Sequence, residues 1–217
     1  MPQLWSQGRG PYALLALLLF TIFVIPPVVN NGWFMGIYEV MIALVLIEGI
    51  FAVPYTPSLR FVAICIVVFA VVARALHWFT QNETFAFAEI ISAILAIGLF
   101  VALIVRQYLT RETIKHRIAG AIVVYLLIGL LFARLYELDL LLDPHAFTMR
   151  PGEDTFTMIY FSFVTLLTIG YGDVVPSSSE ARHLAIFEGF LGQLYLVVFI
   201  SSLVAQLVRD KKHNIEN

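Results

Sequence analysis

The chain has 217 residues, of which 60% are hydrophobic and 13% are charged, and its mean hydropathy is +0.90. Soluble domains carry about 25% charged residues, so this composition excludes an ordinary soluble domain and indicates a membrane protein. The net charge of −2 gives no basis for nucleic-acid binding, and the single Cys65 excludes an internal disulfide framework.

Six apolar stretches follow one another along the chain, and each is close to the length of about 20 residues that spans a bilayer. They cover residues 12–29, 33–53, 61–79, 85–105, 118–136 and 184–208. Each is apolar on all sides rather than on one face, which is typical of helices that contact lipid or one another. The first stretch follows only Arg9 and leads directly into the second, so we expect no cleavable signal. The sequence therefore predicts an all-α membrane protein with six transmembrane helices.

A shorter apolar segment, 154–167, lies between the fifth and sixth stretches and is too short to cross a bilayer. Because it leads directly into a glycine-rich loop, we expect a re-entrant helix that enters and leaves the membrane on one side.

The distribution of basic residues indicates that both termini are cytoplasmic. With this orientation nine basic residues lie inside, namely Arg9, Arg60, Arg106, Arg111, Lys115, Arg117, Arg209, Lys211 and Lys212. Only Arg150 and Arg182 lie outside, with Arg134 near the outer end of its helix. This satisfies the positive-inside rule, and we expect a multi-pass protein of the cell (plasma) membrane.

The most informative motif is TLLTIGYGD at residues 165–173, whose core TIGYG we term the GYG loop (168–172). It lies between two apolar spans, after a short aromatic segment and before Pro176. It closely resembles the filter loop of the tetrameric K⁺-channel pore superfamily, in particular its six-span members with one re-entrant loop. The resemblance covers about 118–208, and the compact chain is similar to prokaryotic channels.

The residue types of the GYG loop suit a row of backbone carbonyls. Glycine tolerates φ > 0, so Gly170 and Gly172 permit the alternating backbone in which successive carbonyls face one side. The Thr168 hydroxyl adds an oxygen at the inner end. Ile169 and Tyr171 are expected to face away and to pack the loop from behind.

The resemblance implies a K⁺-selective channel that conducts passively, is not an enzyme and needs no cofactor. K⁺ would be bound at the backbone carbonyls of Thr168, Ile169, Gly170 and Tyr171. One loop offers too few oxygens, and the chain contains no second TIGYG, so several copies are required. The resemblance implies a homotetramer.

The resemblance also assigns residues that support the filter, with some departures from the family pattern. It places Thr165 on the pore helix behind the loop and Asp173 at its outer edge. Many family members carry an acid at the position of Val164 that supports this aspartate, and this chain lacks it. Tyr160 stands where a tryptophan is usual, and its hydroxyl can bond Asp173 instead. Leu167 replaces a common threonine, so a poorly selective cation channel remains an alternative.

Glu188 is a carboxyl group within the last apolar stretch, in its outer half, where it demands a partner. We expect it to support the filter or the pore helix from behind. The alternative is a neutral glutamate bonded to neighbouring backbone.

The last span is expected to line the pore. The family places a flexible glycine at the position of Gly192, which acts either as a gating hinge or as a site of close helix packing. Helical spacing from Gly192 places a set of residues on one face, whose lower members would form apolar rings that gate by dewetting. The set is Gly192, Gln193, Leu196, Ile200, Val204 and Val208.

The first four spans, residues 1–105, form a predicted peripheral domain. Its fourth span has no arginine before Arg106, so we expect weak or absent voltage dependence. Glu39, Arg74 and Glu89 fall at similar depth in the outer third, and a structural clasp is the favoured arrangement. A proton-coupled transporter that uses these charges is a further alternative.

The remaining predicted units are a basic cytoplasmic linker (106–117), the pore domain (118–208) and a short cytoplasmic tail (209–217). The linker either binds anionic lipid of the inner leaflet or anchors the chain by the positive-inside rule. With so short a tail we expect no cytoplasmic ligand-binding domain, and the sequence does not indicate the gating stimulus.

Overall fold

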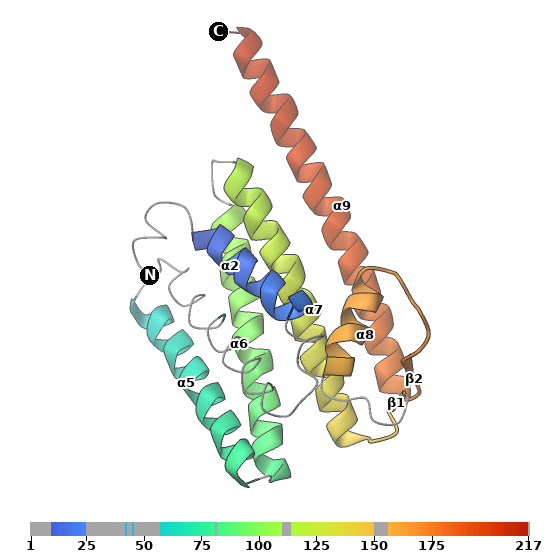
Figure 1. Ribbon diagram of the computed structural model, residues 1–217. Coiled ribbons are helices and arrows are strands. Elements are labelled where there is room, and N and C mark those ends of the chain that lie inside the picture. Colours follow the sequence, from blue (N-terminus) through green and yellow to red (C-terminus); the bar gives the residue numbers. More distant parts are fainter. Residues whose placement is uncertain are drawn as a thin grey trace.

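The computed structural model describes residues 10–24, 42, 45, 57–80, 82–109, 114–149 and 156–216. Helices make up most of this part of the chain (Figure 1). In chain order the elements are α2 (Gly10–Leu19), the π-helix η1 (Phe20–Val24), α5 (Pro57–Thr80), α6 (Glu83–Leu109), α7 (Ile114–Leu142), β1 (Phe147–Thr148), α8 (Phe156–Leu166), β2 (Val175–Pro176) and α9 (Ser179–Glu216).

Within the described residues, three helical segments are long and apolar enough to cross a membrane. They are Glu83–Arg106, Arg117–Leu142 and Ser179–Ala205, and shorter apolar helices cover Tyr12–Val24, Phe61–His77 and Thr157–Leu166. These helices agree with the prediction of a membrane protein built mostly from helices. The second predicted span lies outside the described residues except for 42 and 45, so the six-span count stays a prediction.

Helix α7 is the centre of the packing, because α2, α6, α8 and α9 all contact it. Its span is 61% buried inside the chain, whereas the span of α9 is only 11% buried. The main core lies where α2 and α6 pack on α7, around Leu18, Ile104 and Leu127. Close van der Waals packing of these apolar side chains holds the peripheral helices against α7, while α9 keeps a long apolar surface uncovered in the single chain.

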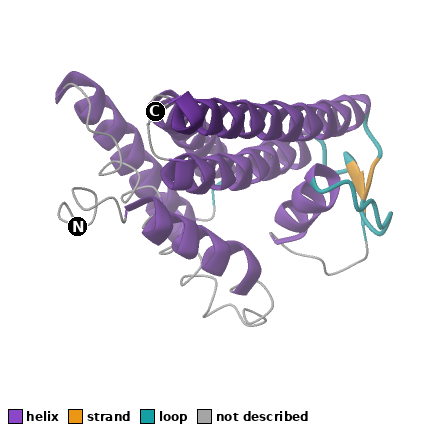
Figure 2. Cartoon of the chain, turned by 90° about the horizontal axis from the view of Figure 1, so that it is seen from above, coloured by secondary structure: helices purple, strands orange, loops and turns teal. Residues whose placement is uncertain are grey.

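Two short strands join the chain before α8 to the chain after the GYG loop. β1 pairs antiparallel with β2, with Phe147 opposite Pro176 and Thr148 opposite Val175. Both ends of the segment therefore lie at the same end of α7 and α9, as Figure 2 shows. This agrees with the re-entrant arrangement that the segment's length predicts.

Helix α9 continues through Val208 to Glu216 and extends beyond the ends of the other helices (Figure 1). Most of the predicted tail is thus a continuation of the last helix. The predicted linker is similarly divided, because α6 ends at Leu109 and α7 begins at Ile114.

Candidate functional site

The GYG loop has an alternating backbone. Thr168, Gly170 and Gly172 have φ angles of 58°, 62° and 77°, so every second residue has a left-handed backbone conformation. The residue types predict this conformation for the two glycines, where it costs little. At Thr168 the same conformation is uncommon for a residue with a side chain, and the sequence did not indicate it. An alternation of this kind allows successive carbonyls to face one side.

The direction of these carbonyls follows from how the loop is attached to α8. Ile169 N–H donates to the Val164 carbonyl at 2.8 Å, and Thr168 N–H donates to the Thr165 carbonyl at 2.9 Å. In a planar trans peptide the C=O points opposite to the following N–H. Since these N–H groups point to α8, the carbonyls of Leu167 and Thr168 point away from it.

Hydrogen bonds also satisfy the C-terminal end of α8, where helix carbonyls have no partner within the helix. The Phe163 carbonyl accepts from Leu167 N–H at 3.0 Å, and the Leu166 carbonyl accepts from the Tyr125 hydroxyl at 3.0 Å. Tyr125 lies on α7, so this bond fixes the end of α8 about midway along α7. The GYG loop therefore starts from a well-anchored point.

The side chains of Ile169 and Tyr171 lie beside α8, as expected. With Phe23 and Phe163 among the other residues, they line an apolar groove of about 300 Å³. The Tyr171 ring stacks on Tyr160 of α8, with 6.4 Å between ring centroids and 4° between ring planes. Tyr171 is still 69% exposed in the single chain, so this groove has room for further packing.

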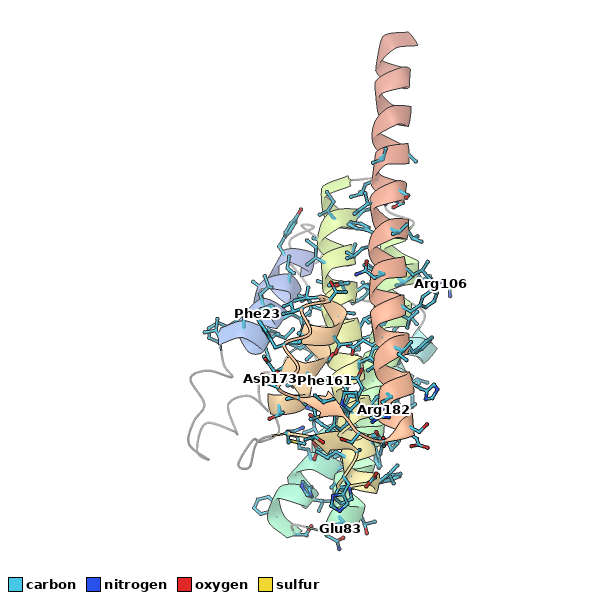
Figure 3. The ribbon with its side chains drawn as sticks, turned by 90° about the vertical axis from the view of Figure 1, so that its right-hand side faces the viewer. Phe23, Glu83, Arg106, Phe161, Asp173 and Arg182 are labelled. Atoms are coloured by element: carbon cyan, nitrogen blue, oxygen red, sulfur yellow. The ribbon has the colours of Figure 1, made fainter. Side chains whose placement is uncertain are left out.

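Asp173 follows the C-terminal end of the loop. Its Oδ2 accepts a hydrogen bond from the Tyr160 hydroxyl at 2.6 Å, which is the contact that the sequence predicts in place of the usual tryptophan. Its Oδ1 accepts from the Val174 N–H at 3.1 Å. In Figure 3, Glu83 and Arg106 mark the two ends of α6, and Asp173 lies at a level between them. Val164 is buried, and its carbonyl, rather than an acidic side chain, holds the loop.

Glu188 lies in the N-terminal half of α9 and is completely buried. Its Oε2 accepts a hydrogen bond from the Tyr136 hydroxyl of α7 at 2.5 Å, and its Oε1 lies 2.5 Å from the Ser162 hydroxyl of α8. Glu188 therefore contacts α8, the helix that precedes the GYG loop, and its role in supporting a filter stays a prediction. Tyr136 and Ser162 were not predicted as the hydrogen-bond partners of Glu188. Their hydroxyl groups within two otherwise apolar segments were the signal that could have indicated them.

Gly192 faces α8 rather than the exposed surface of α9. A Cβ atom at Gly192 would lie 2.8 Å from Leu166 Cδ1 and 3.2 Å from the Leu166 carbonyl oxygen. The structure thus supports the close-packing reading of Gly192, and its place on the pore-lining face stays a prediction. Of the other predicted lining residues, Gln193, Ile200 and Val204 are exposed, Leu196 is partly buried, and the side chain of Val208 lies outside the described residues.

The predicted charge cluster is present in part. The Arg74 guanidinium of α5 pairs with the Glu89 carboxylate of α6 at 2.5 Å, and both groups are largely buried. Glu39 lies outside the described residues. A second pair joins Arg134 to Glu137 at 2.6 Å on α7, and Glu137 is near enough to interact electrostatically with Arg74 and Glu89. From the sequence, Arg134 was placed only near the outer end of its helix, and this second pair was not predicted.

An apolar cavity of about 110 Å³ lies between the start of α7 and α9, next to the predicted linker. Arg117, Val124, Tyr195 and Phe199 are among the residues that line it. Among the described residues no group of three or more His, Cys, Asp and Glu side chains forms a metal site.

Residues 120–209, from α7 through the GYG loop to α9, match the family model for ion channels. Two-pore potassium channel 2 of Arabidopsis thaliana is 28% identical over 97 residues, which are 45% of this chain and 20% of that protein. Probable potassium channel protein 2 of Methanocaldococcus jannaschii is 36% identical over 61 residues, which are 28% of this chain and 18% of that protein.

A third relative, Two pore potassium channel a of Oryza sativa subsp. japonica, is 35% identical over 54 residues, which are 25% of this chain and 16% of that protein. The chain thus spans a fifth or less of the length of these curated relatives. No solved structure matches the chain significantly. The comparisons support the channel superfamily for the segment that carries the GYG loop.

Proposed function

We propose that the chain is one subunit of a K⁺-selective channel that conducts passively through a central four-fold pore in the cell membrane. The observation that carries this proposal is the alternating backbone of the GYG loop, with positive φ at Thr168, Gly170 and Gly172. Carbonyl oxygens on a fixed backbone replace the hydration shell of K⁺. The names of the matched relatives, all potassium channels, support the choice of ion.

K⁺ is bound in this proposal at the carbonyls of Thr168, Ile169, Gly170 and Tyr171, and ions advance between these sites by mutual repulsion. The bond from Ile169 N–H to α8 turns the carbonyl of Thr168 away from that helix, which supports its use as a ligand. Residues behind and beside the loop hold its shape; they are Tyr160, Thr165, Asp173 and Glu188.

Assembly of several copies is supported by the chemistry of the loop and by the surface of α9, and the family resemblance implies four. One loop supplies too few oxygens to surround an ion, so copies of the chain must share the site. Large apolar side chains on α9 are exposed in the single chain, among them Ile186, Phe190 and Val197. Close van der Waals packing of such side chains against neighbouring subunits stabilises the assembly.

Weak or absent voltage dependence is part of the proposal. Steep voltage dependence needs several charges per subunit that cross the field. In α6 the single arginine is Arg106, close to the end of the helix. Arg74 is held by its ion pair with Glu89, an arrangement that favours a fixed structural role over movement.

Both termini are placed in the cytoplasm, and lipid contacts are proposed at the basic linker, residues 106–117. Arg117 beside an apolar cavity supports contact with an anionic lipid, whose chain and headgroup match those two features.

The test is ion flux through purified protein in liposomes, with K⁺ and Na⁺ varied separately. The wild type is expected to pass K⁺ in preference to Na⁺. Gly170→Ala is expected to abolish selective flux, because its φ of 62° disfavours a side chain. Gly98→Ala in α6 is the matched control, because its Cβ would meet no atom within 4 Å.

Two results would contradict the proposal. Equal K⁺ and Na⁺ permeability would identify a poorly selective cation channel. Uptake that saturates at low substrate and requires a proton gradient would identify a transporter.

A further inference from the structure

Glu188 joins three helices at the level of the re-entrant segment. It lies on α9, and its two carboxyl oxygens contact Tyr136 of α7 and Ser162 of α8. The Ser162 hydroxyl also lies 2.7 Å from the Gly129 carbonyl oxygen of α7. A row of four groups therefore connects the three helices, running from Tyr136 of α7 to Glu188 of α9, then to Ser162 of α8 and back to the Gly129 carbonyl of α7.

The site excludes water. Tyr136, Ser162 and Glu188 each have no exposed surface. Phe147 and Phe161 pack edge-on against the Tyr136 ring, with centroid distances of 5.6 and 4.9 Å. Inside such an apolar shell an ionised carboxylate without a cation is strongly disfavoured.

The number of protons in the row shows how it is bonded. Three oxygen–oxygen contacts at 2.5, 2.5 and 2.7 Å each require one proton between the two oxygens. The Tyr136 and Ser162 hydroxyls supply one proton each, and the Gly129 carbonyl supplies none. Only the carboxyl of Glu188 can supply the third proton.

We infer that Glu188 is a neutral carboxylic acid that positions the pore helix through a directed hydrogen-bond chain. Tyr136 donates to Glu188 Oε2, Glu188 Oε1–H donates to Ser162 Oγ, and Ser162 donates to the Gly129 carbonyl. Every donor and acceptor in the row is then satisfied. This arrangement combines support of the pore helix with a neutral glutamate, but the partners of Glu188 are the side chains of Tyr136 and Ser162 and not the neighbouring backbone that the alternative reading expected.

The chain of bonds acts on the filter through α8. Ser162 lies two residues before Val164, whose carbonyl accepts the N–H groups of Ile169 and Gly170. A shift of Ser162 relative to α7 and α9 therefore moves the point from which the GYG loop starts. Ser162, Tyr136 and Glu188 are thus positioning residues for the proposed filter, and this role rests on the proposed function.

The experiment compares three variants of the full-length protein in liposomes. Glu188→Gln keeps the row, because its amide N–H donates to Ser162 and its oxygen accepts from Tyr136. Glu188→Leu removes the row and leaves the Tyr136 hydroxyl buried without its acceptor. Tyr136→Phe combined with Glu188→Leu removes both polar partners, so the assembly regains stability while the tie from α9 to Ser162 remains absent.

The readouts are the rate at which K⁺ current declines under sustained conduction, the yield of tetramer, and infrared absorption of protonated carboxyl groups. Glu188→Gln is expected to keep the wild-type rate within about twofold, whereas Glu188→Leu and the double variant raise it at least about fivefold. The double variant is expected to regain tetramer yield without regaining the slow decline. The infrared band of a buried protonated carboxyl is expected in the wild type and absent in Glu188→Gln.

Several results would overturn the inference. Absence of that band shows an ionised Glu188, and a fast decline in Glu188→Gln shows that the acid itself is needed. A wild-type rate in the double variant shows that the row positions nothing. If the wild type passes no K⁺, the proposed function fails, while the infrared band still decides whether Glu188 carries the proton.

Discussion

The Tyr160 hydroxyl donates to Asp173 Oδ2 at 2.6 Å and so ties the outer end of the GYG loop to the helix that precedes it. At the other end of the loop, the N–H of Ile169 bonds the Val164 carbonyl of the same helix. The loop is therefore fixed to α8 at both ends. Between these points the backbone holds its alternating conformation, and the stacked rings of Tyr160 and Tyr171 support it from the side.

We predict that Tyr160→Phe loosens the outer end of the loop. A hydrogen bond to a charged group contributes about 1.5–3 kcal/mol, and the smaller value applies here because Tyr160 is 39% exposed. The expected result is a severalfold faster decline of K⁺ current with little change in tetramer yield. Tyr160→Trp is the control, since an indole N–H can also donate to Asp173. Equal rates in the wild type and Tyr160→Phe would show that the bond has no part in filter stability.

Gly192→Ala is expected to destabilise the assembly by about 1–3 kcal/mol, because the added Cβ overlaps Leu166. Gly189→Ala is the matched control one turn earlier, where a Cβ meets no atom within 4 Å and alanine stabilises the helix by up to about 1 kcal/mol. Thermal unfolding of the purified tetramer measures both. If Gly192 were instead a gating hinge, Gly192→Ala would change open probability while leaving the unfolding temperature as in the wild type.

Separating Arg74 from Glu89 is expected to destabilise the peripheral helices. Removing one partner of a buried ion pair costs about 3–5 kcal/mol, because the other charge is left behind. Arg74→Gln and Glu89→Gln should each lower the unfolding temperature, and Arg74→Met with Glu89→Leu should lower it less than the sum of the single changes.

The same variants test the voltage prediction. The conductance–voltage relation is expected to stay shallow in Arg74→Gln as in the wild type, because the arginine is a clasp and not a moving charge. A steep relation in the wild type that flattens in Arg74→Gln would refute this.

Val204→Asp is expected to keep the pore open. Val204 is exposed on the single chain, and in a tetramer a ring of such apolar residues gates by excluding water. A charge in that ring keeps it hydrated. Single-channel recording should show a higher open probability for Val204→Asp than for the apolar control Val204→Ile. Unchanged open probability would remove Val204 from the gate.

Local features of the molecule could be predicted from the sequence. Uninterrupted apolar runs predicted membrane helices, because a segment that crosses the bilayer must be apolar and must satisfy its own backbone hydrogen bonds. The glycines at 170 and 172 predicted positive φ, because that preference belongs to the residue itself. The bond from Tyr160 to Asp173 was expected from a resemblance that aligned both positions.

Contacts between distant segments were decided by the tertiary structure. Tyr136 and Glu188 are 52 positions apart and Ser162 and Glu188 are 26 apart, so only the packing of α7, α8 and α9 brings their oxygens together. The side of α9 that meets α8 likewise follows from the fit of Leu166 against Gly192, which helical periodicity alone does not contain. The sequence determined which segments enter the membrane and which loop can present carbonyls. The tertiary structure decided which buried polar groups hold that loop in place, because a buried hydrogen bond requires its partner at a definite distance.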